Sequence, residues 1–441
     1  VCADLFGAFV IAYPPAAGWL ALSAAAALIA VGAGRSRRAD ALAWRDIPVG
    51  VAATAILLVG AATLLSLTRH LTGAGFGFTE QRPLLARFPL FEVAMAASGV
   101  GVALFAAAAL AGRRRGVAGV WTGLLATTWA AAAALQIAAP TIAFVLAWPL
   151  IAAGLLSGLT AAGARRQAVA VALGLIVAAV TLGWLGGLFH GILQSLDIPE
   201  APALIVWLAA LVLWPLAWPE SASRRRFAPG AVALLAGLAI ALFMLATSPW
   251  SVRHPQAAEP LYVLNPQSGQ AWRADAVAPD AWSRAVLATD GGAIGALRLP
   301  GLARPIAAAP ARPVPVAAPP IGVTRAADGT VTLRAPWVAN LLALRLDLLC
   351  DTLVAGARID GRPAPILIAP GRWTHLRWQA APGGLTVSFK PAGPGVFTVR
   401  WAQYLEGWPK AAKPLPPIPA DVMGWDLVGS TVAVGSMRER L

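Results

Sequence analysis

Four ionisable side chains in the apolar half of the sequence are of types that can carry chemistry. Glu92 lies inside the apolar run FPLFEVAMAA, and His70, His190 and Asp197 lie near the ends of other apolar runs. Carboxylates and imidazoles at a membrane boundary can bind a metal ion or relay protons. None of the four has ligand spacing such as His-Glu-x-x-His. We therefore favour interfacial residues wetted by water or headgroups, with an outward-facing metal or proton site as the alternative.

The second half of the sequence offers less chemistry. His254 and His375 are its histidines, and the alternating pattern around His375 favours a structural or surface role. The chain contains no nucleophile elbow, phosphate-binding loop or dinucleotide fingerprint. Cys2 and Cys350 form no metal signature, and we do not favour a bridge between them. The sequence therefore predicts no catalytic residue and no metal ligand in this chain.

Composition indicates a membrane protein with a soluble part. The chain has 441 residues, of which 58% are hydrophobic and 12% charged, whereas soluble domains carry about 25% charged residues. Residues 16–250 contain eight apolar segments long enough to cross a bilayer. We predict spans at about 16–33, 47–67, 88–111, 117–137, 140–160, 168–189, 201–218 and 229–248.

Arginines in the loops predict the orientation of these spans. The odd-numbered loops carry twelve arginines and the even-numbered loops carry three. Because positive residues stay on the cytoplasmic side, the odd loops are expected inside and both ends of the chain outside. The net charge of +14 is therefore a sign of membrane topology and not of nucleic-acid binding.

The part after residue 250 reads as β structure. LYVLN and QAWRA predict a hairpin within residues 251–320, followed by a Pro/Ala-rich connection. Residues 321–441 contain short alternating strands separated by turn signals, including Asp360-Gly361-Arg362-Pro363. We therefore expect a helical membrane bundle followed by a mainly-β, sandwich-like extracytoplasmic domain.

Three stretches resemble a known family. ADLFGAFVIAYP (3–14) is similar to the segment that follows the catalytic domain in membrane-bound zinc peptidases of metallopeptidase family M-28, which include endoplasmic reticulum metallopeptidases, vacuolar membrane proteases and bacterial relatives. Asp4, Gly7, Tyr13 and Pro14 match the family pattern, while Ala3 stands where an aromatic residue is expected. Residues 361–395 and 407–436 resemble the C-terminal domain of the bacterial members.

The resemblance implies a longer enzyme of which this chain is the C-terminal portion. Such enzymes have one span, an extracytoplasmic peptidase domain with two zinc ions, eight spans and an extracytoplasmic C-terminal domain. The zinc-binding motifs do not occur here, so zinc is expected in an upstream domain and residues 1–15 form the junction with it. The implied partners are the bilayer, that peptidase domain and its peptide substrates, with both ends on the periplasmic side of a bacterial inner membrane.

Two other functions stay open at this point. The first is a non-catalytic membrane protein in which the β domain is a binding or assembly module. The second is a small-molecule or lipid transporter that uses Glu92 as its coupling residue.

Overall fold

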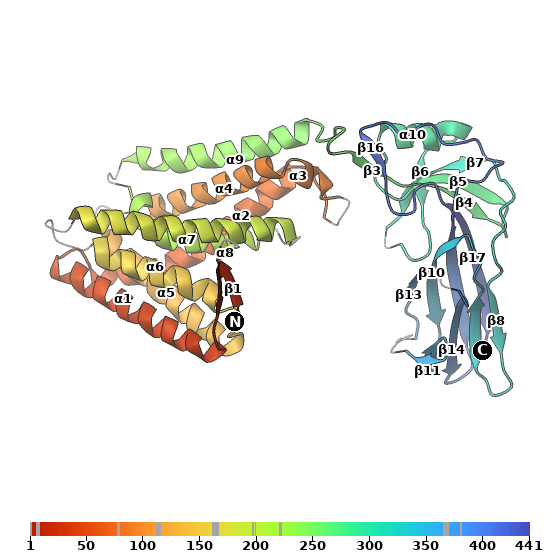
Figure 1. Ribbon diagram of the computed structural model, residues 1–441, viewed down its shortest axis with the longest axis horizontal. Helices are drawn as coiled ribbons and strands as arrows, with labels where there is room; N and C mark the ends of the chain where they lie inside the picture. Colours follow the sequence, from red (N-terminus) through yellow and green to blue (C-terminus); the bar gives the residue numbers. More distant parts are fainter. Residues whose placement is uncertain are drawn as a thin grey trace. The chain divides into compact units, whose positions relative to one another are not determined.

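The chain divides into two compact units, Val1–Pro249 and Trp250–Leu441 (Figure 1). The first unit is mostly helical and the second is mostly β. The computed structural model describes residues 2–5, 9–76, 80–111, 116–160, 167–195, 198, 200–219, 223–302, 304–364, 370–379 and 382–441.

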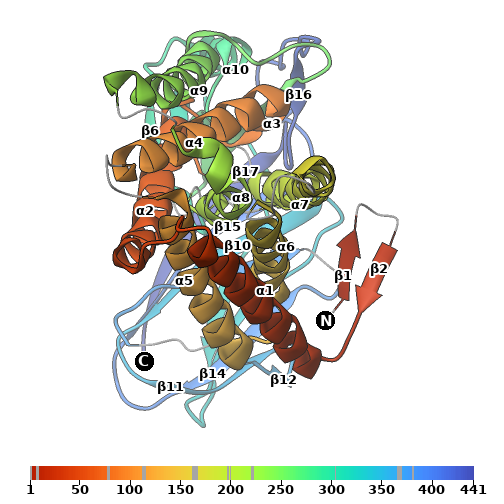
Figure 2. The same ribbon diagram turned by 90° about the vertical axis from the view of Figure 1, so that its left-hand side faces the viewer.

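A short hairpin precedes the helices. Strand β1 (Cys2–Leu5) pairs antiparallel with β2 (Phe9–Ala12), and the 3-10 helix η1 (Pro15–Ala17) leads into α1 (Gly18–Arg38). Figure 2 shows the two strands beside the beginning of α1. The segment predicted as a junction therefore has regular structure in its described part.

Each of the eight predicted apolar segments forms a helix. Among the described residues, six helices are long and apolar enough to cross a membrane, while α6 and α8 have 17 and 16 residues. At about 1.5 Å per residue, these two are about 24–26 Å long, which is less than the hydrocarbon core of about 30 Å. The expected eight spans thus correspond to six helices of full length and two shorter ones. The eight are α1, α2 (Ile47–Leu71), α4 (Phe88–Leu110), α5 (Val117–Ala138), α6 (Phe144–Thr160), α7 (Gln167–Ser195), α8 (Pro202–Ala217) and α9 (Ala228–Ala246).

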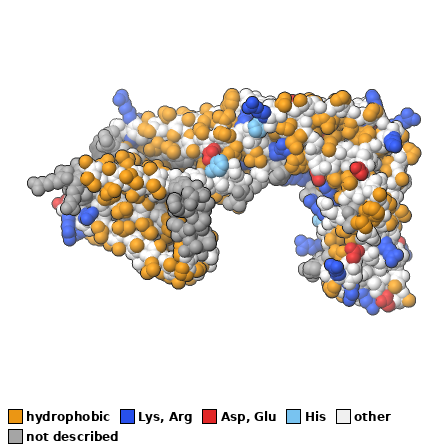
Figure 3. Space-filling model, in the orientation of Figure 1, with side chains coloured by type: hydrophobic (Ala, Val, Ile, Leu, Met, Phe, Trp, Pro, Cys, Tyr) orange, Lys and Arg blue, Asp and Glu red, His pale blue; other side chains and the backbone are white. Residues whose placement is uncertain are grey.

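Helix α8 is the centre of the helical unit. It packs against α2, α4, α5, α6 and α7, and Leu208, Leu211 and Trp214 on it are fully buried. A helix that is apolar on all sides is typical of such a buried position. The more peripheral α7 and α9 instead present large apolar side chains outward, among them Val169, Leu175, Val232 and Leu235. Figure 3 shows hydrophobic side chains over most of the visible face of this unit.

Small residues and one buried carboxylate join α2 to α5. A Cβ atom on Gly123 would overlap the carbonyl oxygen of Ile47, and one on Gly50 would lie 2.7 Å from the Cα of Gly123. Just before α2, the buried Asp46 accepts a hydrogen bond of 2.9 Å from the N–H of Gly116, the N-cap residue of α5. The carboxylate therefore satisfies an N–H group that α5 leaves unpaired at its start.

Short connecting elements complete the helical unit. They are η2 (Trp44–Asp46), α3 (Arg82–Ala86) and η4 (Arg224–Phe227).

The second unit contains an eight-stranded and a five-stranded sheet. The strand order is β13-β10-β15-β17-β4-β5-β7-β6 in the larger sheet and β12-β11-β14-β9-β8 in the smaller. The larger sheet consists of β4 (Pro260–Asn265), β5 (Gln270–Asp275), β6 (Gly295–Leu297), β7 (Ile306–Ala311), β10 (Leu341–Cys350), β13 (Thr374–Gln379), β15 (Val396–Leu405) and β17 (Thr431–Arg440). The smaller consists of β8 (Gly322–Arg325), β9 (Val331–Ala335), β11 (Val354–Ile359), β12 (Arg362–Pro363) and β14 (Leu385–Pro391).

The remaining elements of this unit are short. They are β3 (Gln256–Ala258), which pairs in parallel with β16 (Val422–Gly424), the helix α10 (Ala281–Leu287) and the 3-10 helix η5 (Ala288–Asp290).

A shared apolar core joins the two sheets. Leu333 and Phe389 of the smaller sheet belong to one buried cluster with Leu346 and Phe397 of the larger. Buried and partly exposed residues alternate along β10 and β14, which is the pattern of sheets packed on one face. The predicted mainly-β region is confirmed, and four strands from residues 251–320 extend the sheet built by residues 321–441.

Two predicted hairpins are confirmed. LYVLN and QAWRA form β4 and β5, paired antiparallel from Pro260↔Asp275 to Asn265↔Gln270. Asp360 and Gly361 connect β11 to β12 with φ angles of 48° and 77°. These positive angles are those of a type I′ turn, for which Asp-Gly is a preferred sequence.

Candidate functional site

Glu92 and His190 form a polar pair between α4 and α7. The Nδ1 atom of His190 lies 3.1 Å from Oε1 of Glu92, and the side chains are 47% and 31% exposed. Phe88, one turn before Glu92 on α4, packs edge-on against the imidazole with ring centroids 4.9 Å apart. Because both polar side chains keep an exposed portion, the pair is accessible to a ligand from outside the bundle.

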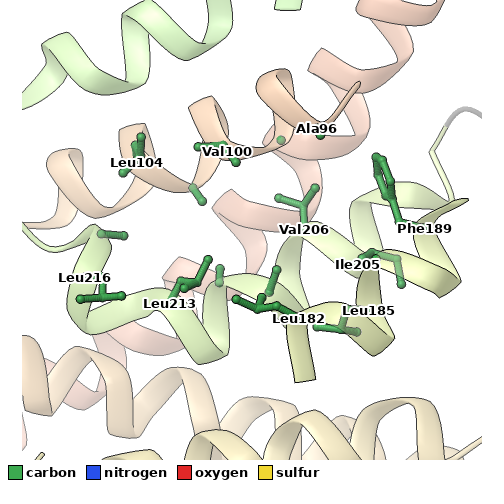
Figure 4. A pocket seen from close by; sticks show the side chains of 16 residues that line it. Ala96, Val100, Leu104, Leu182, Leu185, Phe189, Ile205, Val206, Leu213 and Leu216 are labelled. Carbon is green, nitrogen blue, oxygen red and sulfur yellow. The ribbon is translucent and has the colours of Figure 1, made fainter. Parts of the chain in front are cut away.

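An apolar groove adjoins this pair. It has a volume of about 310 Å³ and is lined by side chains of α4, α7 and α8. Figure 4 shows Ala96 and Phe189 at one end and Leu104 and Leu216 at the other. Ala96 follows Glu92 by one helical turn and Phe189 precedes His190, so the pair lies next to the first of these ends.

The other predicted polar residues do not join the pair. Nδ1 of His70 lies 2.7 Å from the carbonyl oxygen of Ser66, and its ring packs at a tilt against Phe76 with ring centroids 5.4 Å apart. Ser66 donates to Glu200 at 3.3 Å. Asp197 lies outside the described residues. The structure thus brings together Glu92 and His190, two of the four candidates. The sequence alone did not predict that these two side chains pair.

The described ranges contain no group of three or more His, Cys, Asp or Glu side chains that could hold a metal ion. The pair of Glu92 and His190 supplies two ligand side chains, which is fewer than the three or four that a protein zinc site requires. Its chemistry is hydrogen bonding and proton exchange.

The junction motif is anchored to the helical unit. Asp4 lies in β1 opposite Val10, and Gly7 is outside the described residues. Tyr13 makes a side-chain hydrogen bond with Trp148 of α6, and burial raises its pKa. Pro14 precedes η1 as its N-cap residue.

A second contact fixes the start of α1. The Nε2 atom of Gln136, a buried residue of α5, donates to the carbonyl oxygen of Pro15 at 2.8 Å. Gly18 leaves room for this amide, because a Cβ atom there would overlap it. The segment before α1 is therefore held by α5 and α6 together.

The β unit holds buried polar residues that sequence reasoning missed. Glu259 and Tyr404 are 6% and 1% exposed, and the guanidinium of Arg345 lies 4.6 Å from the Tyr404 ring centroid. Burial, reinforced by the carboxylate of Asp426, raises the pKa of Glu259 to about 7 despite Arg345. Burial also raises the pKa of Tyr404 to about 12.

His375 lies at the surface of the β unit, as its alternating sequence context predicts, and Cys350 lies in the core. His375 is 60% exposed and lies 2.6 Å from Asp347 on the neighbouring strand. Cys350 is a buried free thiol in the β core.

Comparisons with protein-family models, with curated proteins and with solved structures found no match to this chain.

Proposed function

We propose that this chain is the membrane-anchoring and C-terminal part of a zinc-dependent, aminopeptidase-like metallopeptidase similar to family M-28. The observation that carries the proposal is the resemblance of residues 3–14 to the family junction, together with the order of the parts behind it. A short hairpin, an apolar helical unit and a β unit follow one another in the order that the resemblance implies.

In this proposal all eight apolar helices cross a bacterial inner membrane. The arginine-rich loops are cytoplasmic, and residue 1 and the β unit are periplasmic. The shorter α6 and α8 are compatible with crossing, because both are largely buried among other helices.

The junction contacts support an anchoring role. Gln136 and Trp148, on two different helices, bond the segment that contains Tyr13 and Pro15. A peptidase domain attached before this segment would be held at a fixed height above the bilayer, which would restrict the peptides that reach it.

Peptide-bond hydrolysis belongs to the upstream domain in this proposal. Two zinc ions there would activate a water molecule. The described residues offer no fitting donor set, so the role of this chain is to anchor and position that domain and shape substrate access.

An activity assay on the product of the whole reading frame tests the proposal. We expect the detergent-purified protein to hydrolyse aminoacyl-coumarin amides, to lose activity with 1,10-phenanthroline and to regain it with Zn²⁺. A reading frame that encodes no zinc-peptidase domain before Val1, or an activity indifferent to the chelator, would contradict it.

A transporter remains the second candidate because Glu92 has a partner in His190. A coupling carboxylate needs such a neighbour to exchange its proton. The Glu92→Gln variant should then abolish solute flux into proteoliposomes, and an unchanged flux would exclude this role.

A further inference from the structure

Helices α4 and α7 lie on two sides of the groove, and α8 contributes its floor. Both α4 and α7 pack against the central α8, and all three contribute lining residues. The α4 side of the groove is lined by small residues at spacings of three and four, which leave space between α4 and α8. They are Ala96, Gly99 and Ala103. This spacing was visible in the sequence, but its meaning depends on which helices face it.

The size of the groove fits one lipid chain. Its lining on α8 extends from Ile205 to Ala217, which is about 18 Å of helical rise. One leaflet of the hydrocarbon core is about 15 Å thick. The groove thus has the length of a single acyl chain, and Val100 and Leu216, which line it, are 51% and 79% exposed.

The polar pair adds a preference for one headgroup chemistry. When Nδ1 of His190 donates to Oε1 of Glu92, the remaining lone pairs of the carboxylate are free to accept. A primary ammonium group can donate to this carboxylate, whereas a quaternary ammonium has no N–H to donate. A charge-assisted hydrogen bond to the Glu92 carboxylate therefore favours a headgroup with a primary ammonium.

We propose that the groove binds a bilayer phospholipid with a primary ammonium headgroup, its acyl chain along α8 and its ammonium on the Glu92 carboxylate, which His190 holds in place. Bilayer lipid is the occupant because the groove opens on the side of helices whose length and composition are those of membrane spans. The site is independent of the peptidase proposal and is testable without any peptidase activity.

Native mass spectrometry of the full chain tests the site. The protein is incubated in micelles with equimolar dioleoyl phosphatidylethanolamine and phosphatidylcholine. We expect ethanolamine-lipid adducts to exceed choline-lipid adducts by about threefold, the effect of a partly exposed charge contact. Glu92→Gln should bring the ratio to about one while retaining adducts. An unchanged ratio in Glu92→Gln would overturn the headgroup assignment.

A groove-filling substitution tests the chain position. Val100→Trp should remove adducts of both lipids, whereas the matched change Val232→Trp, at a 67% exposed position of α9, should leave them. Adducts that persist in Val100→Trp at wild-type levels would overturn the proposal.

A second measurement covers the case in which Val100→Trp does not fold. A phosphatidylethanolamine with a diazirine on its acyl chain is photolysed with the wild-type protein in nanodiscs. We expect cross-links on peptides with Leu104 and Leu213, which line the groove. Cross-links spread evenly over α1 and α9, which do not line the groove, with no enrichment at the groove, would overturn the site.

Discussion

At the scale of single residues, the β unit contains a buried titratable carboxyl, Glu259, between β3 and β4. The backbone N–H of Glu259 donates to the buried Asp275 at 3.1 Å, and burial raises the pKa of both carboxyls. Asp426 adds a like charge near Glu259, which further favours the protonated form. Glu259 is therefore protonated in the folded chain at pH values where the unfolded chain has lost that proton.

This difference makes the β unit less stable as the pH rises. Between about pH 4.5 and the folded pKa of about 7, the native state binds more protons than the unfolded state. The free energy of unfolding should fall across this window by up to about 3 kcal/mol. The raised pKa of Asp275 acts in the same direction. Glu259→Gln should remove most of the fall and stabilise the protein at pH 8. Hydrogen exchange of β4 peptides, corrected for intrinsic rates, measures it.

Glu406→Gln serves as the matched control, because Glu406 is exposed in the same unit. Equal pH dependence in Glu259→Gln and Glu406→Gln would show that Glu259 is not the titrating group.

At the scale of elements, α2 and α5 cross closely through glycine. Gly50 faces the backbone of Val120 and Leu124, and Gly123 faces the carbonyl oxygen of Ile47. Backbones that approach this closely leave no space for a side chain, as in other packed membrane helices. Spacing alone does not identify such a contact, because Gly183 and Gly187 have small-xxx-small spacing, yet a Cβ atom on Gly187 would meet nothing within 4 Å.

Enlarging Gly123 should therefore separate α2 from α5. We expect Gly123→Leu to lower the free energy of unfolding by about 3 kcal/mol, because the backbone of Ile47 cannot move without shifting α2. Gly187→Leu, at an open position of α7, should change it by less than about 0.5 kcal/mol. Titration with dodecyl sulfate, followed by ellipticity at 222 nm, measures both. Equal losses in the two variants would mean that the crossing is not tightly packed.

The elements also show which features a sequence can predict. Apolar runs and the Asp360-Gly361 turn are local, so the helices and the β11–β12 hairpin followed from composition and turn chemistry. The pairing of Glu92 with His190 joins positions 98 residues apart and depends on α4 and α7 both packing on α8. The strand order likewise depends on a contact between residues far apart in the sequence, because β17 (Thr431–Arg440) pairs in parallel with β4 (Pro260–Asn265).

The count of full-length helices was the less predictable part of the membrane unit. Hydropathy marks α6 and α8 as apolar but does not show where these helices begin and end. Pro149 and Pro215 do not mark the ends either, because both helices continue past them. Their burial follows from tertiary packing, with Leu150 and Leu208 fully buried.

At the scale of the whole molecule, the number of membrane crossings decides whether the junction hairpin and the β unit lie on the same side of the membrane. Eight crossings put the junction hairpin and the β unit on the same side, which the peptidase proposal requires. If one of the two short helices failed to cross, seven crossings would put them on opposite sides. Arginines in the odd loops favour eight.

Labelling of single cysteines with a membrane-impermeant maleimide is the most direct measurement of this topology. The two native cysteines are first removed by Cys2→Ser and Cys350→Ala. Single cysteines are then placed at three exposed positions: after α1 (Ala39→Cys), after α5 (Thr141→Cys) and at the start of the β unit (Ser251→Cys). We predict that Thr141→Cys and Ser251→Cys are labelled in intact spheroplasts and Ala39→Cys only after permeabilisation. The eight-crossing topology would be contradicted if Thr141→Cys were labelled and Ser251→Cys were not, or if Ala39→Cys were labelled in intact spheroplasts.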